Sequence, residues 1–242
     1  MSAIDVTEVT RRFGDLTVLD SLSFSVEDGE VFGLVGPNGA GKTTTVNVLT
    51  GVVAPDSGTV RVLGLDPTAD STGVRAAVGI LPEKESPPAF LTPREYFSFV
   101  ADVREIPADV ARDRMDEWVD HLAFSEKLDV LCKDLSRGQQ QKVMFAQAFL
   151  HEPELVFIDE PLANLDPLMQ EVITEFITSY HAAGNTIVLS THQLDIAEEI
   201  CTRIGVLHDG SIATEHVPGG DESVRDVFKR TVTASVARAP VR

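Results

Sequence analysis

The sequence predicts an α/β fold, and three patterns along the chain lead to that prediction. Short runs rich in β-forming residues come first, and strand patterns alternate with helical patterns from residue 41 onward. The segments 31–35 and 155–158 are apolar on both faces of a two-residue repeat, as parallel strands covered on both sides are. Residues 83–152 instead carry apolar side chains at helical spacing. We therefore expect a mostly parallel sheet whose chain is interrupted by a helical block.

The order of these patterns predicts a single domain. Residues 1–82 and 153–216 would form a split core, 83–152 an inserted helical subdomain, and 217–242 a C-terminal tail. Before the insert we expect strands at 4–9, 22–26 and 31–35, and within it helices at 94–104, 108–122 and 137–150. After it we expect strands at 155–158 and 186–190, helices from 167 and around 194–200, and a short helix at 224–230 followed by a fraying tail.

Composition narrows the classes of function. The 242 residues are 43% hydrophobic, which is enough for a substantial core. Acidic residues outnumber Lys and Arg by 38 to 20, and the formal charge of -18 disfavours non-specific binding to nucleic acid or anionic lipid. No apolar stretch reaches the roughly 20 residues of a membrane-spanning helix, and no secretory signal is visible, so we expect a cytosolic chain. Its acid-rich, Lys-poor composition resembles that of proteins from salt-loving microbes.

Residues 36–43 match the phosphate-binding pattern G-x-x-x-x-G-K-[ST]. The motif follows a predicted buried strand and opens a predicted helix, so its backbone N–H groups and the helix dipole would both favour an anion, the dipole by about 0.3 to 1 kcal/mol. Lys42 would contact the β- and γ-phosphates, and the Thr43 hydroxyl would bind Mg²⁺. The motif predicts a P-loop NTPase, with nucleotide contacts from Gly36, Pro37, Asn38, Gly39, Ala40, Gly41, Lys42, Thr43 and Thr44.

A second chemical motif ends the strand at 155–158. Asp159 and Glu160 follow that strand directly, and carboxylates at such a strand end lie beside a phosphate loop in this class of fold. Asp159 is the expected metal partner. Glu160 points in another direction and is the expected base that orients or deprotonates the attacking water.

The two motifs together with Leu135-Ser-Arg-Gly-Gln-Gln-Gln-Lys142 closely resemble the ATP-binding cassette (ABC) ATPases of transporters, over residues 3–215. The segment at 135–142 resembles that family's signature, usually Leu-Ser-Gly-Gly-Gln. Ser136 would cap the helix that follows, and its hydroxyl and the helix N–H groups would face an anion. The resemblance implies a RecA-like core with a mostly parallel sheet, an N-terminal antiparallel β subdomain and an inserted helical subdomain.

Further nucleotide contacts are implied by the same resemblance. Phe13 resembles the aromatic residue that stacks on adenine, a contact worth about 1 to 3 kcal/mol per base, and Val18 is counted with it. Ser136, Gly138 and Gln139 would contact the γ-phosphate held by a second copy. Asp166 resembles the D-loop that crosses between subunits, although it could equally be a plain helix N-cap. His192 resembles the switch histidine that touches the γ-phosphate.

Two positions depart from the family pattern. Glu83 stands where the family usually has Gln, so a residue that only accepts hydrogen bonds adds negative charge beside the nucleotide and the metal. Within the family, Glu here resembles the branch of ABC-2-type exporters, and Glu83 is an expected contact of both nucleotide and metal. Arg137 replaces the first signature glycine, and it could pair with a partner carboxylate, face the nucleotide of a second copy, or lie in solvent.

The resemblance implies an ATPase that dimerises head to tail with two ATP molecules between the copies, requires Mg²⁺, and acts on the cytoplasmic face of the membrane with a separate membrane permease subunit. The helical block around Phe90 and Tyr96 is where the family receives the permease. An exporter is favoured over an importer. An ABC ATPase acting in cluster assembly or another non-transport process is the main alternative, and an unrelated P-loop kinase or GTPase would leave the segment at 135–142 unexplained.

Overall fold

The computed structural model describes residues 2–84, 86–160, 162 and 165–236. The N-terminal part forms a three-stranded antiparallel sheet in the order β2-β1-β4, built from β1 (Ser2–Phe13), β2 (Leu16–Glu27) and β4 (Ser57–Val62). The predicted runs at 4–9 and 22–26 lie inside β1 and β2. Strand β4 was missed, because its exposed first half hides the apolar pattern.

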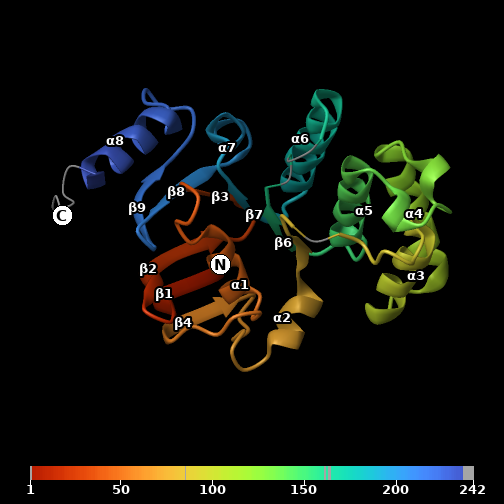
Figure 1. Cartoon of the computed structure of the whole chain (residues 1–242), viewed down its shortest axis with the longest axis horizontal. Helices are drawn as coiled ribbons and strands as arrows, with labels where there is room; N and C mark the ends of the chain where they lie inside the picture. Colours follow the sequence, from red (N-terminus) through yellow and green to blue (C-terminus); the bar gives the residue numbers. More distant parts are fainter. Residues whose placement is uncertain (1, 85, 161, 163–164, 237–242) are drawn as a thin grey trace.

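A six-stranded sheet in the order β5-β6-β7-β3-β8-β9 forms the centre of the molecule (Figure 1). The pairings among the first five strands are parallel, and β9 is antiparallel to β8. The strands are β3 (Val31–Val35), β5 (Gly79–Leu81), β6 (Leu155–Asp159), β7 (Thr186–Thr191), β8 (Arg203–His208) and β9 (Ser211–His216). The predicted fold class, an α/β P-loop fold with an N-terminal antiparallel sheet, is confirmed.

Side chains of the central strands divide between two apolar clusters. Successive residues of a strand point to opposite faces, so Phe32 and Phe157 pack toward the antiparallel sheet and α1 (Lys42–Leu49). Val156 and Ile158 pack on the other face, toward the helical region and the C-terminal helices. The apolar runs that predicted these strands therefore reflect burial on both faces.

The helices of the insert lie together at one end of the molecule (Figure 1). They are α3 (Pro93–Val103), α4 (Ala108–His121) and α5 (Arg137–Phe149), with short 3-10 turns at Ser125–Lys127 and Cys132–Asp134. Both α3 and α5 begin with a capping box, in which the Thr92 or Ser136 side chain and the side chain three residues later bind each other's backbone N–H.

The remaining helices are α2 (Ser71–Ala77), α6 (Pro167–Ala182), α7 (Leu194–Ile200) and α8 (Val224–Val236). Helix α8 lies at the end of the molecule opposite the insert (Figure 1) and is longer than the predicted helix at 224–230. The last residues of the predicted tail, 237–242, lie outside the described residues. Within the described part of the chain, no helix is long and apolar enough to cross a membrane.

Candidate functional site

The phosphate loop connects β3 to α1, and two of its glycines are required by close contacts. Gly41 has a φ of +107°, and a Cβ there would lie 3.0 Å from the Val18 carbonyl oxygen. A Cβ on Gly36 would lie 2.5 Å from the Leu207 carbonyl oxygen. Larger residues at either place would push the loop away from its supporting strands. Lys42 Nζ donates to the carbonyl oxygens of Gly36 at 2.8 Å and Pro37 at 3.4 Å, so its ammonium group lies back against the loop.

Asp159 faces the start of α1 from the end of β6. Its Oδ2 accepts a hydrogen bond of 2.9 Å from the Thr43 hydroxyl. Burial raises the pKa of Asp159 above its ordinary value, the nearby charges of Glu83 and Glu160 raise it further, and the Thr43 hydrogen bond acts in the opposite direction. A hydroxyl and a carboxylate thus lie together where negative charge is concentrated and poorly compensated.

Glu160 is held at the end of β7 by three donors. Its Oε2 accepts from the Thr191 hydroxyl at 3.0 Å, and its Oε1 accepts from the backbone N–H of His192 at 2.9 Å. His192 Nδ1 lies 2.6 Å from the same Oε1, so this nitrogen carries the proton when Glu160 is ionised. Glu160 is only 6% exposed and has a φ of +54°, a costly conformation for a non-glycine residue.

These groups line one cavity of about 540 Å³. Most of the predicted nucleotide and metal contacts lie along it, and its lining consists of Leu16, Val18, Asn38, Gly39, Gly41, Lys42, Thr43, Thr44, Glu83, Lys84, Asp159, Glu160 and His192. Gly36, Pro37 and Ala40 form the loop without lining the cavity. Sequence reasoning missed Leu16 and Lys84. Leu16 shares a strand face with Val18, and Lys84 follows Glu83, with its Nζ 3.9 Å from Glu83 Oε2.

Phe13 does not line this cavity. The residue is 46% exposed, and the Arg11 guanidinium lies 4.6 Å from the ring centroid. Arg11 Nη1 is itself held by the Ala54 carbonyl oxygen at 3.0 Å and by Asp56 Oδ1 at 3.2 Å. The guanidinium therefore covers one face of the ring.

The segment at 135–142 lies apart from the cavity. The Ser136 hydroxyl accepts from the Gln139 N–H at 3.3 Å, and Gln139 Oε1 accepts from the Ser136 N–H at 2.9 Å. Ser136 and Arg137 are exposed, and Gly138 is half-buried at the start of α5. None of these residues lines the phosphate-loop cavity. Within one copy of the chain, the two motifs thus do not form one site.

Asp166 caps α6. Its side chain accepts a hydrogen bond of 3.1 Å from the Met169 N–H, so the plain capping role foreseen for it is present, and the residue is exposed. It also lies outside the lining of the phosphate-loop cavity.

A family model described as ABC transporter matches residues 19–163. A second model, described as an AAA domain, matches residues 130–198. Among curated relatives, the Nod factor export ATP-binding protein I of Paraburkholderia xenovorans is 36% identical over 217 residues, which cover 90% of this chain and 71% of the relative. The protein of the same name from Burkholderia pseudomallei is 34% identical over 218 residues, covering 90% of this chain and 72% of the relative.

Solved structures agree with these sequence matches. A structure described as the ATP-binding subunit of an ABC transporter superposes with a TM-score of 0.88 at 28% identity, over 95% of this chain and 99% of that one. A bacterial ABC transporter cassette, solved as a dimer, has the same fold, with a TM-score of 0.80 at 24% identity over 90% of this chain and 99% of that one. The chain belongs to the ABC transporter family, as a nucleotide-binding subunit.

Proposed function

We propose that this chain hydrolyses ATP as one of two copies and couples the reaction to export by a separate membrane subunit. The observation that carries the proposal is the phosphate-loop cavity, whose lining includes the ammonium group of Lys42 and the carboxylates of Asp159 and Glu160. Phosphoryl transfer to water depends on charge neutralisation and on positioning the water, and these are the groups that such a reaction requires.

Binding of the triphosphate would begin at Lys42. Its Nζ has only neutral carbonyl partners in the loop, so a phosphate oxygen can replace them and form a stronger, charge-assisted hydrogen bond. The backbone N–H groups of the loop and the start of α1 would bind the remaining oxygens. Leu16 and Val18 would then contact the sugar or base.

The residues around Asp159 fit a magnesium ion. The Thr43 hydroxyl and the Asp159 carboxylate are hard oxygen donors of the kind that Mg²⁺ prefers, and the raised pKa of Asp159 indicates that a cation there would be stabilised. No group of three or more Asp, Glu, His or Cys side chains suited to a metal is found among the described residues. Phosphates and water would therefore supply the remaining ligands of the ion. When bound, Mg²⁺ would neutralise charge on the phosphate oxygens.

Glu160 would orient the attacking water and accept its proton. In the present arrangement the donors of Thr191 and His192 occupy the carboxylate. His192 is exposed on the cavity side of this pair, so its ring can turn to a γ-phosphate, which would free Oε1 for the water.

A second copy would complete the site. The exposed start of α5 presents the Ser136 hydroxyl and unpaired helix N–H groups, which favour an anion. Because Ser136, Gly138 and Gln139 do not reach the cavity of their own chain, we place them against the γ-phosphate bound by the other copy, with Asp166 near the same interface. Arg137 would add a positive charge there.

The membrane subunit would dock in a groove of about 590 Å³ that adjoins the nucleotide cavity. The groove shares Thr43, Glu83 and Asp159 with that cavity and extends to Tyr96 on α3. Val52 in its lining is an exposed apolar residue, and Phe99 and Val103, also exposed, follow Tyr96 along α3. A helix of the membrane subunit that binds in this groove would respond to the nucleotide through Glu83.

Of the two residues expected to contact the membrane subunit, Tyr96 is the better candidate. Phe90 is 79% exposed and lies outside the lining of the groove. The direction of transport follows the curated relatives, whose names describe export ATP-binding proteins.

The substitution Glu160→Gln tests the proposal. The amide preserves the shape of the side chain but accepts a proton far more weakly, so ATP hydrolysis should fall about 10² to 10⁴-fold. The affinity for a fluorescent ATP analogue should remain within about twofold of that of the unchanged protein, which corresponds to a change in binding free energy of less than about 0.5 kcal/mol. Glu171→Gln, on the exposed side of α6, is the matched control and should leave the rate unchanged. Hydrolysis at a near-normal rate by the Glu160 variant would refute the role of this residue.

A further inference from the structure

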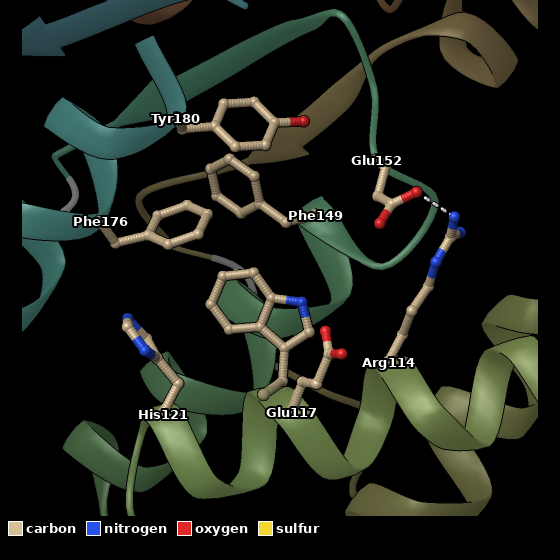
Figure 2. Close-up of a pocket in the computed structure, with 8 residues that line it drawn as sticks. Arg114, Glu117, His121, Phe149, Glu152, Phe176 and Tyr180 are labelled. Carbon is tan, nitrogen blue, oxygen red and sulfur yellow. Dashed lines mark hydrogen bonds and ion pairs between the residues drawn. The ribbon is translucent and has the colours of Figure 1, made fainter. Parts of the chain in front are cut away.

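A separate cavity of about 280 Å³ lies between α4, the end of α5 and α6 (Figure 2). It shares no lining residue with the nucleotide cavity or with the groove beside it. Its lining contains four aromatic side chains, which are Trp118, Phe149, Phe176 and Tyr180. The nucleotide chemistry proposed above makes no use of this cavity.

The aromatic rings form one connected cluster. The centroids of Trp118 and Phe176 are 4.7 Å apart, and those of Phe149 and Tyr180 are 5.0 Å apart, both in edge-to-face arrangements. Figure 2 shows the rings of Phe149, Phe176 and Tyr180 together, with Glu117 below them and Glu152 to their right, beside Arg114. The faces of aromatic rings carry partial negative charge, so a ring face that is turned to the cavity attracts cations.

The charged residues leave one carboxylate uncompensated. Arg114 forms an ion pair with Glu152 and also donates to the Leu150 carbonyl oxygen at 3.1 Å. Glu117 has no ion-pair partner among the residues that the structure describes. The lining therefore sets two carboxylates against one guanidinium and the imidazole of His121, beside the aromatic walls, in a chain whose formal charge is -18.

Few oxygen atoms are available to replace the water around a small inorganic cation. The Tyr180 hydroxyl is already bound to the Pro153 carbonyl oxygen at 2.5 Å, and Glu152 is engaged by Arg114. Metal ions such as Ca²⁺ need six or more oxygen ligands. A quaternary ammonium group holds its water weakly, and it is bound by aromatic rings together with a nearby carboxylate.

We propose that this cavity binds a small water-soluble molecule carrying a trimethylammonium group, with its methyl groups against the aromatic cluster and its charge near Glu117. The cavity volume of about 280 Å³ lies just below the range of about 300 to 1,000 Å³ that is usual for drug-sized ligands, so it suits a ligand of few atoms. The ligand would contact α4 of the helical region and α6 of the core at once.

The sole tryptophan of the chain provides a direct readout, because Trp118 lines the cavity. The experiment titrates the full-length protein, without nucleotide, with choline and with its uncharged isostere 3,3-dimethyl-1-butanol at constant ionic strength. We expect a saturable change in Trp118 fluorescence with choline, at an affinity about tenfold higher than for the isostere. A response that is equal for the two compounds, or that NaCl reproduces, would overturn the proposal.

Two charge variants locate the ligand. Glu117→Gln should weaken choline binding about fivefold, since it removes a carboxylate that has no ion pair with any described residue. Asp116→Asn removes an equal charge from the same helix, but Asp116 lines a different groove with Arg94 and Arg112, so choline binding should not change. Equal effects of the two variants would indicate a general electrostatic response and would contradict the site.

A final measurement distinguishes binding of free choline from binding of a lipid head group. Vesicles of phosphatidylcholine carry the same trimethylammonium group on a membrane surface. We expect saturation by free choline in the absence of vesicles. A response to vesicles alone would overturn the assignment to a small soluble ligand.

Discussion

The phosphate-loop side of the core and the signature end of α5 differ in how far their polar groups are satisfied within one chain. On the core side, Lys42, Asp159 and Glu160 each have hydrogen-bond partners and line a common cavity. At the start of α5, the capping box pairs the N–H groups of Ser136 and Gln139, and the signature residues do not line that cavity. One half of a nucleotide site is thus assembled in a single copy, while the other half is presented to a neighbour.

This difference between the two regions shows that the two ends of α5 have different roles. Its N-terminal end carries the signature residues. Just beyond its C-terminal end, His151 and Arg104 attach it to the core, since Arg104 Nη1 lies 2.8 Å from His151 Nε2 and donates to the Ala76 carbonyl oxygen at 2.8 Å. The position of the signature therefore also depends on a joint at the opposite end of α5, where Arg104 lines the groove beside the nucleotide cavity.

The largest expected effect concerns this joint at low pH. His151 Nε2 lies 2.8 Å from Arg104 Nη1 and 3.1 Å from the Val78 carbonyl oxygen. Burial lowers the pKa of His151 to about 4, the Arg104 charge acts in the same direction, and the Val78 contact acts against them. The unfolded chain would bind this proton near pH 6.5. The contribution of neutral His151 to the free energy of unfolding is thus complete above about pH 6.5. It is lost as the pH falls toward 4, by about 3 kcal/mol in total.

Urea unfolding of the unchanged protein and of His151→Gln between pH 7.5 and 4.5 measures this contribution. Other acids titrate equally in both proteins, so the difference in their free energies of unfolding isolates His151. The advantage of the unchanged protein should shrink steadily on acidification. Parallel pH profiles for the two proteins would show that the joint does not depend on a neutral histidine.

The next effect separates the signature half from the core half. Ser136→Ala removes a hydroxyl that we place against a phosphate, a charge-assisted bond worth about 1.5 to 3 kcal/mol, so hydrolysis should fall about 10- to 150-fold. Binding of an ATP analogue to the dilute single copy should not change. Thr92→Ala removes the equivalent capping box from α3 and costs similar helix stability, about 1 kcal/mol, without touching the site. If both variants lost activity equally, the effect of Ser136 would be structural.

A smaller effect tests the base contact on the core side. Phe13→Ala should weaken ATP binding by about 1 to 3 kcal/mol if adenine stacks on the ring face that Arg11 leaves free. Inorganic tripolyphosphate has no base, so its affinity should be the same for the variant and the unchanged protein. Equal losses for ATP and tripolyphosphate would remove Phe13 from the base site and leave Leu16 and Val18 as its contacts.

The sequence predicted the central strands and the phosphate loop because both depend on local rules. Strands buried on both faces are apolar throughout, and the loop requires its glycines at fixed spacing. Strands β8 and β9 were missed. The first is interrupted by Gly205, where a Cβ would lie 2.8 Å from the Phe32 ring, and the second is mostly exposed.

The arrangement around Glu160 was predictable only in part. Its place after a buried strand indicated a catalytic carboxylate, but no local pattern reveals that the distant Thr191 and His192 bind both of its oxygens. The Arg11 contact with Phe13 and the Arg104 contact with His151 likewise depend on how separate elements meet. Such pairings are set by the tertiary fold.

The central claim is that ATP is fully enclosed only between two copies. Sedimentation velocity of Glu160→Gln, with saturating ATP and Mg²⁺ in about 1 M KCl to screen the repulsion between acidic surfaces, tests it most directly. We predict a 26.2 kDa species without nucleotide and a species of twice that mass with ATP. A species that stays at 26.2 kDa under these conditions, with the membrane subunit also added, would contradict the account.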